Sequence, residues 1–280
     1  MHNIESMPAP VPDPQWLAAL QAAANQPPRR ARVPLLLGAH LIGTVEPDLL
    51  EPIAHLASPR LPKVLQREES TTGLAWRVLG DGTQSLQQIA LALREAQLAS
   101  VPGQWRDEQL AVWSPQGEQL ATVERGVARP LGIATRAVHL VGRACDGRYW
   151  VQQRALDKPN DPGLWDTLMG GMVSAADTVS TALARETWEE AGLRLESLQG
   201  LMQGGRLAMR KPSANSHEGY VEELIDWFSA TLPDGVQPDN RDGEVAQFQL
   251  LDDAELLTKL HRNEFTTEAA LILVAALRAR

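Results

Sequence analysis

An acidic helix that ends at a glycine constrains the fold of this chain more than any other feature. Three carboxylates, those of Glu186, Glu189 and Glu190, fall near its end, and Gly192 follows. Residues three and four positions apart share one face of a helix, so these carboxylates are expected to crowd together. The sequence predicts a helix over residues 177–191, because glycine readily adopts the left-handed conformation that closes a helix.

Crowded carboxylates repel one another, so the arrangement costs stability unless cations occupy the space between them. Oxygen ligands suit Mg²⁺ or Mn²⁺, which also bridge phosphate oxygens. The alternative is a solvated acidic helix face, which three glutamates at this spacing more often form when no other motif residues accompany them. Here Arg185 directly precedes the first glutamate and is a candidate to orient a carboxylate by bidentate hydrogen bonds. Asp177 lies at the expected helix start, where the helix dipole favours an acid.

With its surroundings, this helix resembles the Nudix box, G-x(5)-E-x(7)-R-E-U-x-E-E-x-G-U, in which U is a bulky aliphatic residue. The positions that match at the family spacing are Gly171, Arg185, Glu186, Glu189, Glu190, Gly192 and Leu193. Two positions depart from the pattern, because Asp177 replaces its first glutamate and Thr187 replaces its aliphatic residue. Neither departure removes a principal metal ligand of the family pattern.

The resemblance implies a Nudix α/β/α sandwich with a mixed sheet, and a Mg²⁺-dependent hydrolase that cleaves a phosphoanhydride bond. The three glutamates would hold Mg²⁺ or Mn²⁺, and Gly171 would lie beside the ion through its backbone. Arg185 would pair with Asp177 or Glu186 and so orient the metal ligands. The ion would neutralise diphosphate oxygens and lower the pKa of a bound water that attacks phosphorus.

Further site residues are expected outside the helix. Nudix enzymes often take another acid, as ligand or base, from a later loop, and Glu244 is the first candidate and Glu223 the second. The alternative for Glu244 is an ordinary loop glutamate. Arg154 and Lys158 precede the box and are candidates to hold the terminal phosphate, although cations at strand ends and in loops more often only increase solubility.

Aromatic residues before the box are candidates for contacts with the organic part of a substrate. Trp76, Trp105 and Trp113 are large enough to stack on a heteroaromatic ring, and Trp113 is the one we assign to substrate binding. Core or hairpin packing is the commoner role for each of them. His139, on an apolar strand, is expected to be a hydrogen-bonded core histidine.

The resemblance extends past the box to one branch of the family. The segment 150–154, followed by Lys158, Pro162-Gly163 and Trp165, is similar to a branch that has an extra N-terminal domain and occurs alone or fused to thiamine pyrophosphokinase. Its members convert thiamine diphosphate and its oxidised analogues to the monophosphates, which implies that substrate class here. A pyrophosphatase acting on ADP-ribose, dinucleotides or other nucleoside diphosphates stays open, because the box handles phosphates and selectivity comes from other residues.

Two other functions share the fold. Arg154, Pro162-Gly163 and Trp165 also resemble isopentenyl-diphosphate isomerase, but that enzyme needs a cysteine five positions after the tryptophan, where this chain has Gly170. Its one cysteine, Cys145, lies before the preceding strand. A non-catalytic Nudix-fold binding module is the other alternative, although such proteins usually have a degraded box and a DNA-binding appendage.

The pattern of elements predicts an α/β or α+β protein in two parts. Regular patterning breaks between Glu124 and Pro130, which divides the 280 residues into a smaller α+β unit over 1–125 and the Nudix unit over 126–280. Strands are expected over 74–79, 135–141, 149–154 and 221–231, and hairpins over 33–45 and 109–123. Helices are expected over 15–25, 48–56, 85–99 with Ser85 as N-cap, 177–191, 252–260 and 266–277.

Composition narrows the partners. A formal charge of −9 argues against general affinity for nucleic acid, whose binding needs a cationic surface, and favours a small-molecule diphosphate as partner. No apolar run approaches the roughly 20 residues of a membrane span. Residues 1–14 lack the basic-then-apolar pattern of a signal peptide, so a cytoplasmic protein is expected. The acidic balance and the final apolar helix permit a homodimer without requiring one.

Overall fold

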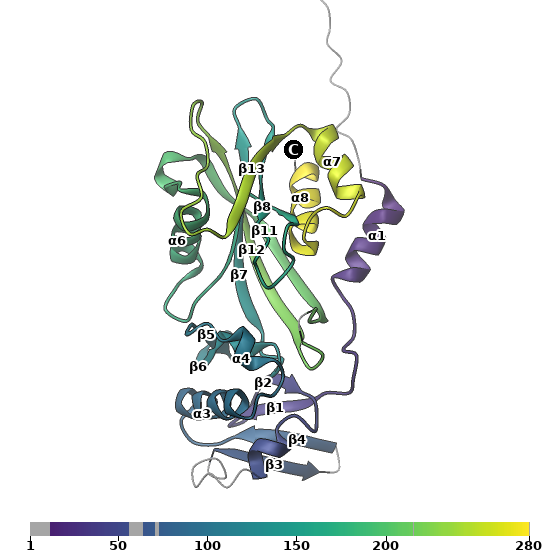
Figure 1. Ribbon diagram of the computed structural model, residues 1–280, viewed down its shortest axis with the longest axis vertical. Helices are drawn as coiled ribbons and strands as arrows, with labels where there is room; N and C mark the ends of the chain where they lie inside the picture. Colours follow the sequence, from purple (N-terminus) through teal and green to yellow (C-terminus); the bar gives the residue numbers. More distant parts are fainter. Residues whose placement is uncertain (1–11, 56–63, 71–72, 215, 280) are drawn as a thin grey trace, which may run out of the picture.

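The structure is a computed structural model that describes residues 12–55, 64–70, 73–214 and 216–279. Its N-terminal part contains a four-stranded sheet in the order β2-β1-β4-β3 (Figure 1). Strand β1 (Val33–Leu37) pairs antiparallel with β2 (His40–Val45) and parallel with β4 (Gly73–Val78), which pairs antiparallel with β3 (Leu65–Ser70). The predicted hairpin over 33–45 is confirmed, and Gly38 turns it with a φ of 58°.

Short helices and a second hairpin complete this part. The helices are α2 (Glu51–His55), α3 (Gly82–Glu95), α4 (Val101–Gln104) and α5 (Arg125–Ala128). Leu56, the last residue of the helix predicted over 48–56, lies outside the described residues. Strands β5 (Gln109–Trp113) and β6 (Gln119–Glu124) form the predicted hairpin.

The predicted start of α3 at Ser85 is wrong. The helix begins three residues earlier, after Asp81, whose carboxylate accepts a hydrogen bond from the Gln84 N–H at 2.9 Å. Ser85 is buried and its hydroxyl donates to the Leu79 carbonyl at 2.6 Å, so it fastens the helix to the preceding strand instead of capping it. The buried Leu86, Ile89 and Leu93 then follow at helical spacing and face the core.

The second part is built on a seven-stranded mixed sheet. Its main path is β11-β12-β7-β8-β13, with β10 paired to β7 and β9 to β8. Strands β7 and β12 run parallel, whereas the other pairs are antiparallel. The strands are β7 (Thr135–Ala144), β8 (Tyr149–Arg154), β9 (Trp165–Asp166), β10 (Met169–Met172), β11 (Gln199–Pro212), β12 (Tyr220–Leu232) and β13 (Val245–Leu251).

Helices cover both faces of this sheet, which confirms the expected α/β/α sandwich (Figure 1). On one face lies α6 (Val179–Ala191), followed by a 3₁₀ turn (Leu195–Ser197). On the other lie α7 (Asp253–His261) and α8 (Thr267–Arg278). The N-cap of α6 is Thr178, so the helix begins two residues after the predicted Asp177, and its predicted end is confirmed.

Helix α1 (Pro14–Ala23) packs on the second part although it precedes the first. Leu17 belongs to the core formed with α8, and the Trp16 ring meets His261 edge-on with centroids 5.0 Å apart. Conversely, Leu131 and Ile133 belong to the N-terminal core. The predicted division between residues 125 and 126 stays a prediction, and the chain crosses between the two cores on both sides of it.

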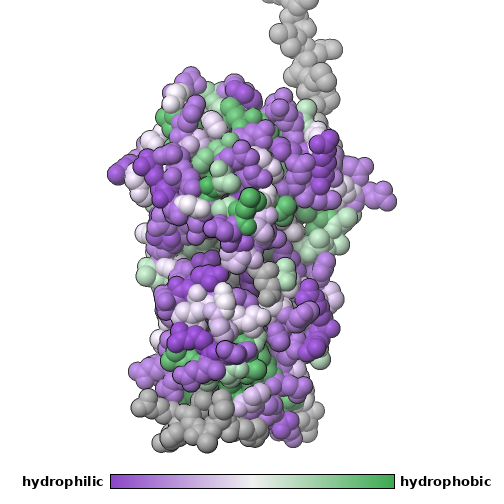
Figure 2. Space-filling model, viewed as in Figure 1, coloured by the Kyte–Doolittle hydropathy of each residue, from purple (hydrophilic) through white to green (hydrophobic). Residues whose placement is uncertain are grey.

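The surface in view is mostly hydrophilic over both parts, with smaller hydrophobic patches (Figure 2). None of the helices that the described residues form has the length and apolar character needed to span a membrane.

Arg32 is one of the residues that join the two parts. The Arg32 guanidinium donates to the Thr44 carbonyl in β2, to the Pro130 carbonyl at 2.7 Å and to the Glu218 carbonyl at 2.6 Å. Within the N-terminal core, backbone also meets backbone, because a Cβ on Gly43 would lie 2.5 Å from the Leu131 carbonyl oxygen. Arg32 thus fastens this close-packed core to Glu218 of the second part.

Replacing this cation should destabilise the whole chain. Arg32→Gln would leave partly buried carbonyls without these donors, at a cost of about 1–3 kcal/mol in the free energy of unfolding. Chemical denaturation measures that cost, and Arg30→Gln is the matched control because 70% of the Arg30 side chain is exposed. Equal stability of the two variants would contradict this account of the interface.

Candidate functional site

Helix α6 approaches strand β10 closely at one glycine. A Cβ on Gly171 would overlap the Glu186 side chain, so any larger residue would force that carboxylate to move. The same strand exposes its Gly170 N–H to Glu190, at 3.1 Å from the carboxylate oxygen. The structure thus places the Gly-Gly pair directly beside the carboxylates of the helix.

Arg185 lies among four oxygen acceptors. Its guanidinium donates to Asp177 at 2.9 Å, to Glu186 at 2.9 Å, to Glu189 at 2.9 Å and to the Met172 carbonyl at 3.3 Å. Burial alone would raise the pKa of Asp177, but hydrogen bonds from Arg185 and neighbouring hydroxyls outweigh it and lower the pKa. Asp177 therefore stays ionised and holds Arg185 in place.

Glu190 is the deepest acid of the helix. It is 1% exposed and accepts hydrogen bonds from Gln152 Nε2 at 2.8 Å and from Lys158 Nζ at 3.3 Å. Burial raises its pKa even though Lys158 opposes the shift. Burial, together with the nearby Glu190 carboxylate, also raises the pKa of Glu186 to about 7. The site therefore confines negative charge that lacks full compensation.

In the structure, an arginine lies between two of the glutamates that were predicted to crowd together. Within the described ranges, no three His, Cys, Asp or Glu side chains stand together in a group that could hold a metal. Arg185 instead bridges Glu186 and Glu189. A divalent ion bound by these glutamates would compete with the guanidinium for the same oxygens.

The cavity in front of the helix nevertheless suits a hard cation. Its volume is about 300 Å³, and ten acidic but five basic side chains line it. The acids are Glu108, Asp161, Asp166, Glu186, Glu189, Glu190, Glu223, Asp242, Glu244 and Glu268, and the bases are Arg125, Arg129, Arg154, Lys158 and Arg185. Oxygen donors with this excess of negative charge are the chemistry that Mg²⁺ or Mn²⁺ prefers.

The structure brings most of the other predicted residues to this acidic cavity. Glu244 lies 2.5 Å from Lys158 Nζ, and burial, which would raise its pKa, is outweighed by Lys158, so the pKa is lowered. Arg154 donates to Asp166 at 3.3 Å. Glu223 also lines the cavity and accepts a hydrogen bond from the Thr135 hydroxyl at 3.0 Å.

Trp113 lies elsewhere. It is absent from the residues of the described chain that line this cavity or the one beside it, and the Arg136 guanidinium lies 4.2 Å from its ring centroid. The assignment of Trp113 to substrate binding stays a prediction. His139 is buried and its Nδ1 lies 2.9 Å from the Thr167 hydroxyl, as expected for a core histidine.

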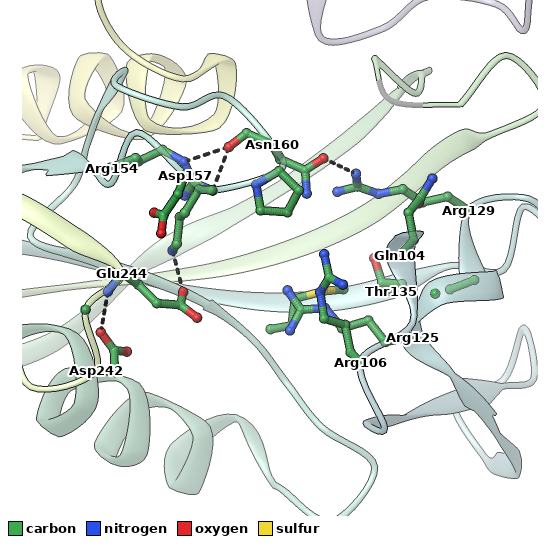
Figure 3. Close-up of a pocket in the computed structure, with 16 residues that line it drawn as sticks. Gln104, Arg106, Arg125, Arg129, Thr135, Arg154, Asp157, Asn160, Asp242 and Glu244 are labelled. Carbon is green, nitrogen blue, oxygen red and sulfur yellow. Dashed lines mark hydrogen bonds and ion pairs between the residues drawn. The ribbon is translucent and has the colours of Figure 1, made fainter. Parts of the chain in front are cut away.

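A second cavity of about 350 Å³ adjoins the first and lies between the two parts of the molecule (Figure 3). The cavities share Arg125, Arg129, Arg154, Lys158 and Glu244. The second cavity is closed on its other side by the N-terminal part, where Arg106 lies.

The sequence analysis missed several of these lining residues. Arg125 and Arg129 lie in the segment treated as a boundary, and their spacing of four residues was the available signal. Asp166 follows Trp165 in the family-like segment but is 1% exposed, and burial raises its pKa. Glu268 comes from α8, and no local pattern links it to the box.

Comparison with known proteins identifies the fold of the second part. Residues 134–270 match the NUDIX domain model. A Saccharomyces cerevisiae protein, "Uncharacterized protein YJR142W", is 28% identical over 64% of this chain and 56% of its own length. The Pseudomonas aeruginosa "Uncharacterized Nudix hydrolase PA4841" is 35% identical over 31% of this chain and 53% of its own length. The chain thus spans about half the length of these curated relatives.

Another relative is named as an isomerase and not as a hydrolase. The isopentenyl-diphosphate Delta-isomerase of Streptomyces coelicolor is 31% identical over 57% of this chain and 79% of its own length. Residues 134–270, which match the NUDIX domain model, contain the glutamate helix α6. The chain belongs to the Nudix family, and residues 134–270 are its NUDIX domain.

Proposed function

We propose that this protein is a divalent-metal-dependent hydrolase that cleaves the phosphoanhydride bond of a small organic diphosphate. The acidic cavity carries the proposal, because its excess of carboxylates would repel a diphosphate unless a cation lay between them. Membership of the Nudix family, and relatives named Nudix hydrolases, support a hydrolase.

Glu186, Glu189 and Glu190 would hold the ion, which we take to be Mg²⁺ or Mn²⁺. When bound, it supplies positive charge to the phosphate oxygens and acidifies a water molecule. Hydrogen bonds from Gln152 and Gly170 keep Glu190 in position. These contacts hold the ligand oxygens in place before substrate binds.

The remaining residues act on the substrate. Arg154 and Lys158 line both cavities and would hold phosphate oxygens. Glu244, 54% exposed and paired with Lys158, would accept the proton of the attacking water. The water oxygen then bonds to phosphorus as the bond from phosphorus to the bridging oxygen breaks, which leaves two monophosphate groups.

For the substrate we propose thiamine diphosphate or its oxidised analogues, which would be converted to the monophosphates. The similarity of residues 150–171 to the branch that acts on thiamine diphosphates supports this choice. Nucleoside-diphosphate derivatives such as ADP-ribose are the second substrate class. Profiling both classes with Mg²⁺ and with Mn²⁺ decides between them.

Purified protein with Mg²⁺ should release phosphate from thiamine-type diphosphates and lose this activity in excess EDTA. Glu189→Gln and Glu190→Gln should each lower kcat by about a hundredfold or more, because each removes an electrostatic stabiliser. Glu196→Gln is the matched control, since Glu196 is exposed in the turn after the helix. Undiminished turnover in both site variants would overturn the assignment, as would failure to hydrolyse any diphosphate of either class.

The similarity to the isomerase raises prenyl diphosphate isomerisation as a second candidate activity. We expect this protein to show no isomerase activity. The position of that family's cysteine is Gly170, where a Cβ would lie 2.5 Å from a carbon of the His139 ring, so a larger side chain has no room. Cys145 Sγ instead contacts the Leu232 carbonyl at 3.5 Å. A turnover assay with isopentenyl diphosphate checks this expectation. Formation of the isomer faster than by a Glu190→Gln variant would contradict it.

A further inference from the structure

We propose that Arg106 of the N-terminal part, with Arg125 and Arg129 of the segment that joins the two parts, forms an anion subsite for the substrate diphosphate. The proposal rests on the proposed function and extends it, because it makes the N-terminal part a component of the substrate site. Figure 3 shows these three side chains on one side of the cavity between the parts, facing Arg154 and Glu244 on the other.

The charge of this cavity is opposite to that of its neighbour. Five basic and three acidic side chains line it, whereas acids outnumber bases two to one in the acidic cavity. Among its bases, Lys158 is paired with Glu244, Arg154 with Asp166, and Arg125 with Glu108 at 2.6 Å, which leaves Arg106 and Arg129 without an acidic partner among the ion pairs of the described residues. The positive excess of this cavity, in a chain of net charge −9, therefore comes mainly from Arg106 and Arg129.

Two of the three arginines have neutral hydrogen-bond partners. Within the described residues, the Arg106 guanidinium donates to the carbonyls of Trp105 at 2.9 Å and Gly103 at 3.4 Å. Arg129 donates to the Asn160 side-chain oxygen at 2.9 Å. Their charge is available to a ligand, and a guanidinium suits phosphate because it donates two parallel hydrogen bonds.

A buried acid positions the subsite. Glu124 is 0% exposed, and its carboxylate accepts hydrogen bonds from the backbone N–H groups of Arg106 at 2.8 Å and Gly126 at 3.2 Å. Helix α5 also lies against the loop before Arg106, because a Cβ on Gly126 would come within 2.7 Å of the Gln104 carbonyl oxygen. Glu124 and Gly126 thus hold the two backbone segments that carry the arginines together.

The two cavities give a diphosphate opposite surroundings at its two ends. One end meets the glutamates of α6, where a divalent ion is required, and the other meets guanidinium groups that need none. Because the cavities share Arg125 and Arg129, one ligand can span both. The subsite would bind ground state and transition state alike, so its loss should raise KM more than it lowers kcat.

The test uses the full chain with Arg106→Gln, Arg129→Gln and the double variant. With the organic diphosphate that the wild-type protein hydrolyses, we expect each single variant to raise KM about fivefold to twentyfold, since a charged hydrogen bond is lost, with kcat within about twofold. The double variant should lose much of the salt dependence of KM. Arg262→Gln is the matched control, because its side chain is 70% exposed and lies outside both cavities.

A binding measurement separates this inference from the proposed function. Inorganic pyrophosphate, titrated calorimetrically in EDTA up to millimolar concentration, should bind the wild-type and Arg262→Gln proteins at least tenfold more tightly than the double variant. Equal binding by the double variant, or no binding by the folded wild-type protein, would overturn the inference whatever the enzyme hydrolyses. A protein that binds pyrophosphate as expected but hydrolyses no diphosphate would refute the proposed function alone.

Discussion

The contact between Arg185 and its acids is the interaction on which the site depends. One guanidinium joins Asp177, before the helix, to Glu186 and Glu189 within it, and it also reaches the Met172 carbonyl of β10. Removing it would leave partly buried carboxylates to repel one another. The glutamates can stand this close because the arginine compensates them, and the same balance leaves oxygens that a stronger cation can take over.

The N-terminal part contacts the loop that precedes helix α6. The Ala175 N–H donates to the Gln109 carbonyl of β5 at 2.7 Å, and the Arg136 guanidinium lies over Trp113 in the same hairpin. The loop that leads from β10 to α6 is therefore held by the other part of the molecule. An accessory domain that was only tethered to the sandwich would need no such contacts. The two parts therefore support the site together.

The sequence predicted what depends on local periodicity and on the box, and it failed where distant contacts decide. Helix α6 and its end at Gly192 followed from helical spacing and from glycine in the left-handed region. Strands β3, β9, β10, β11 and β13 were not among the strands expected from the sequence pattern. Strand β11, for example, is largely exposed along its first half and lacks an alternating apolar pattern. The role of Ser85 was misassigned because its partner, the Leu79 carbonyl, is set by packing. For Trp113, size alone does not show which surface the aromatic ring faces, so its assignment to substrate binding stays a prediction.

The separation of charge between the cavities explains why a family box does not fix the substrate. The glutamate helix places negative charge wherever the box occurs, and under the proposed function that charge would act on any diphosphate through a bound divalent ion. Arg106, Arg125 and Arg129 come from a segment outside the NUDIX domain, so their position depends on Glu124, Gly126 and the close-packed interface around Arg32. A chain with the same box but without that segment would keep the acidic wall and lose the cationic one. Selectivity in this protein is therefore expected to reside in the junction between its two parts, where the sequence pattern was weakest.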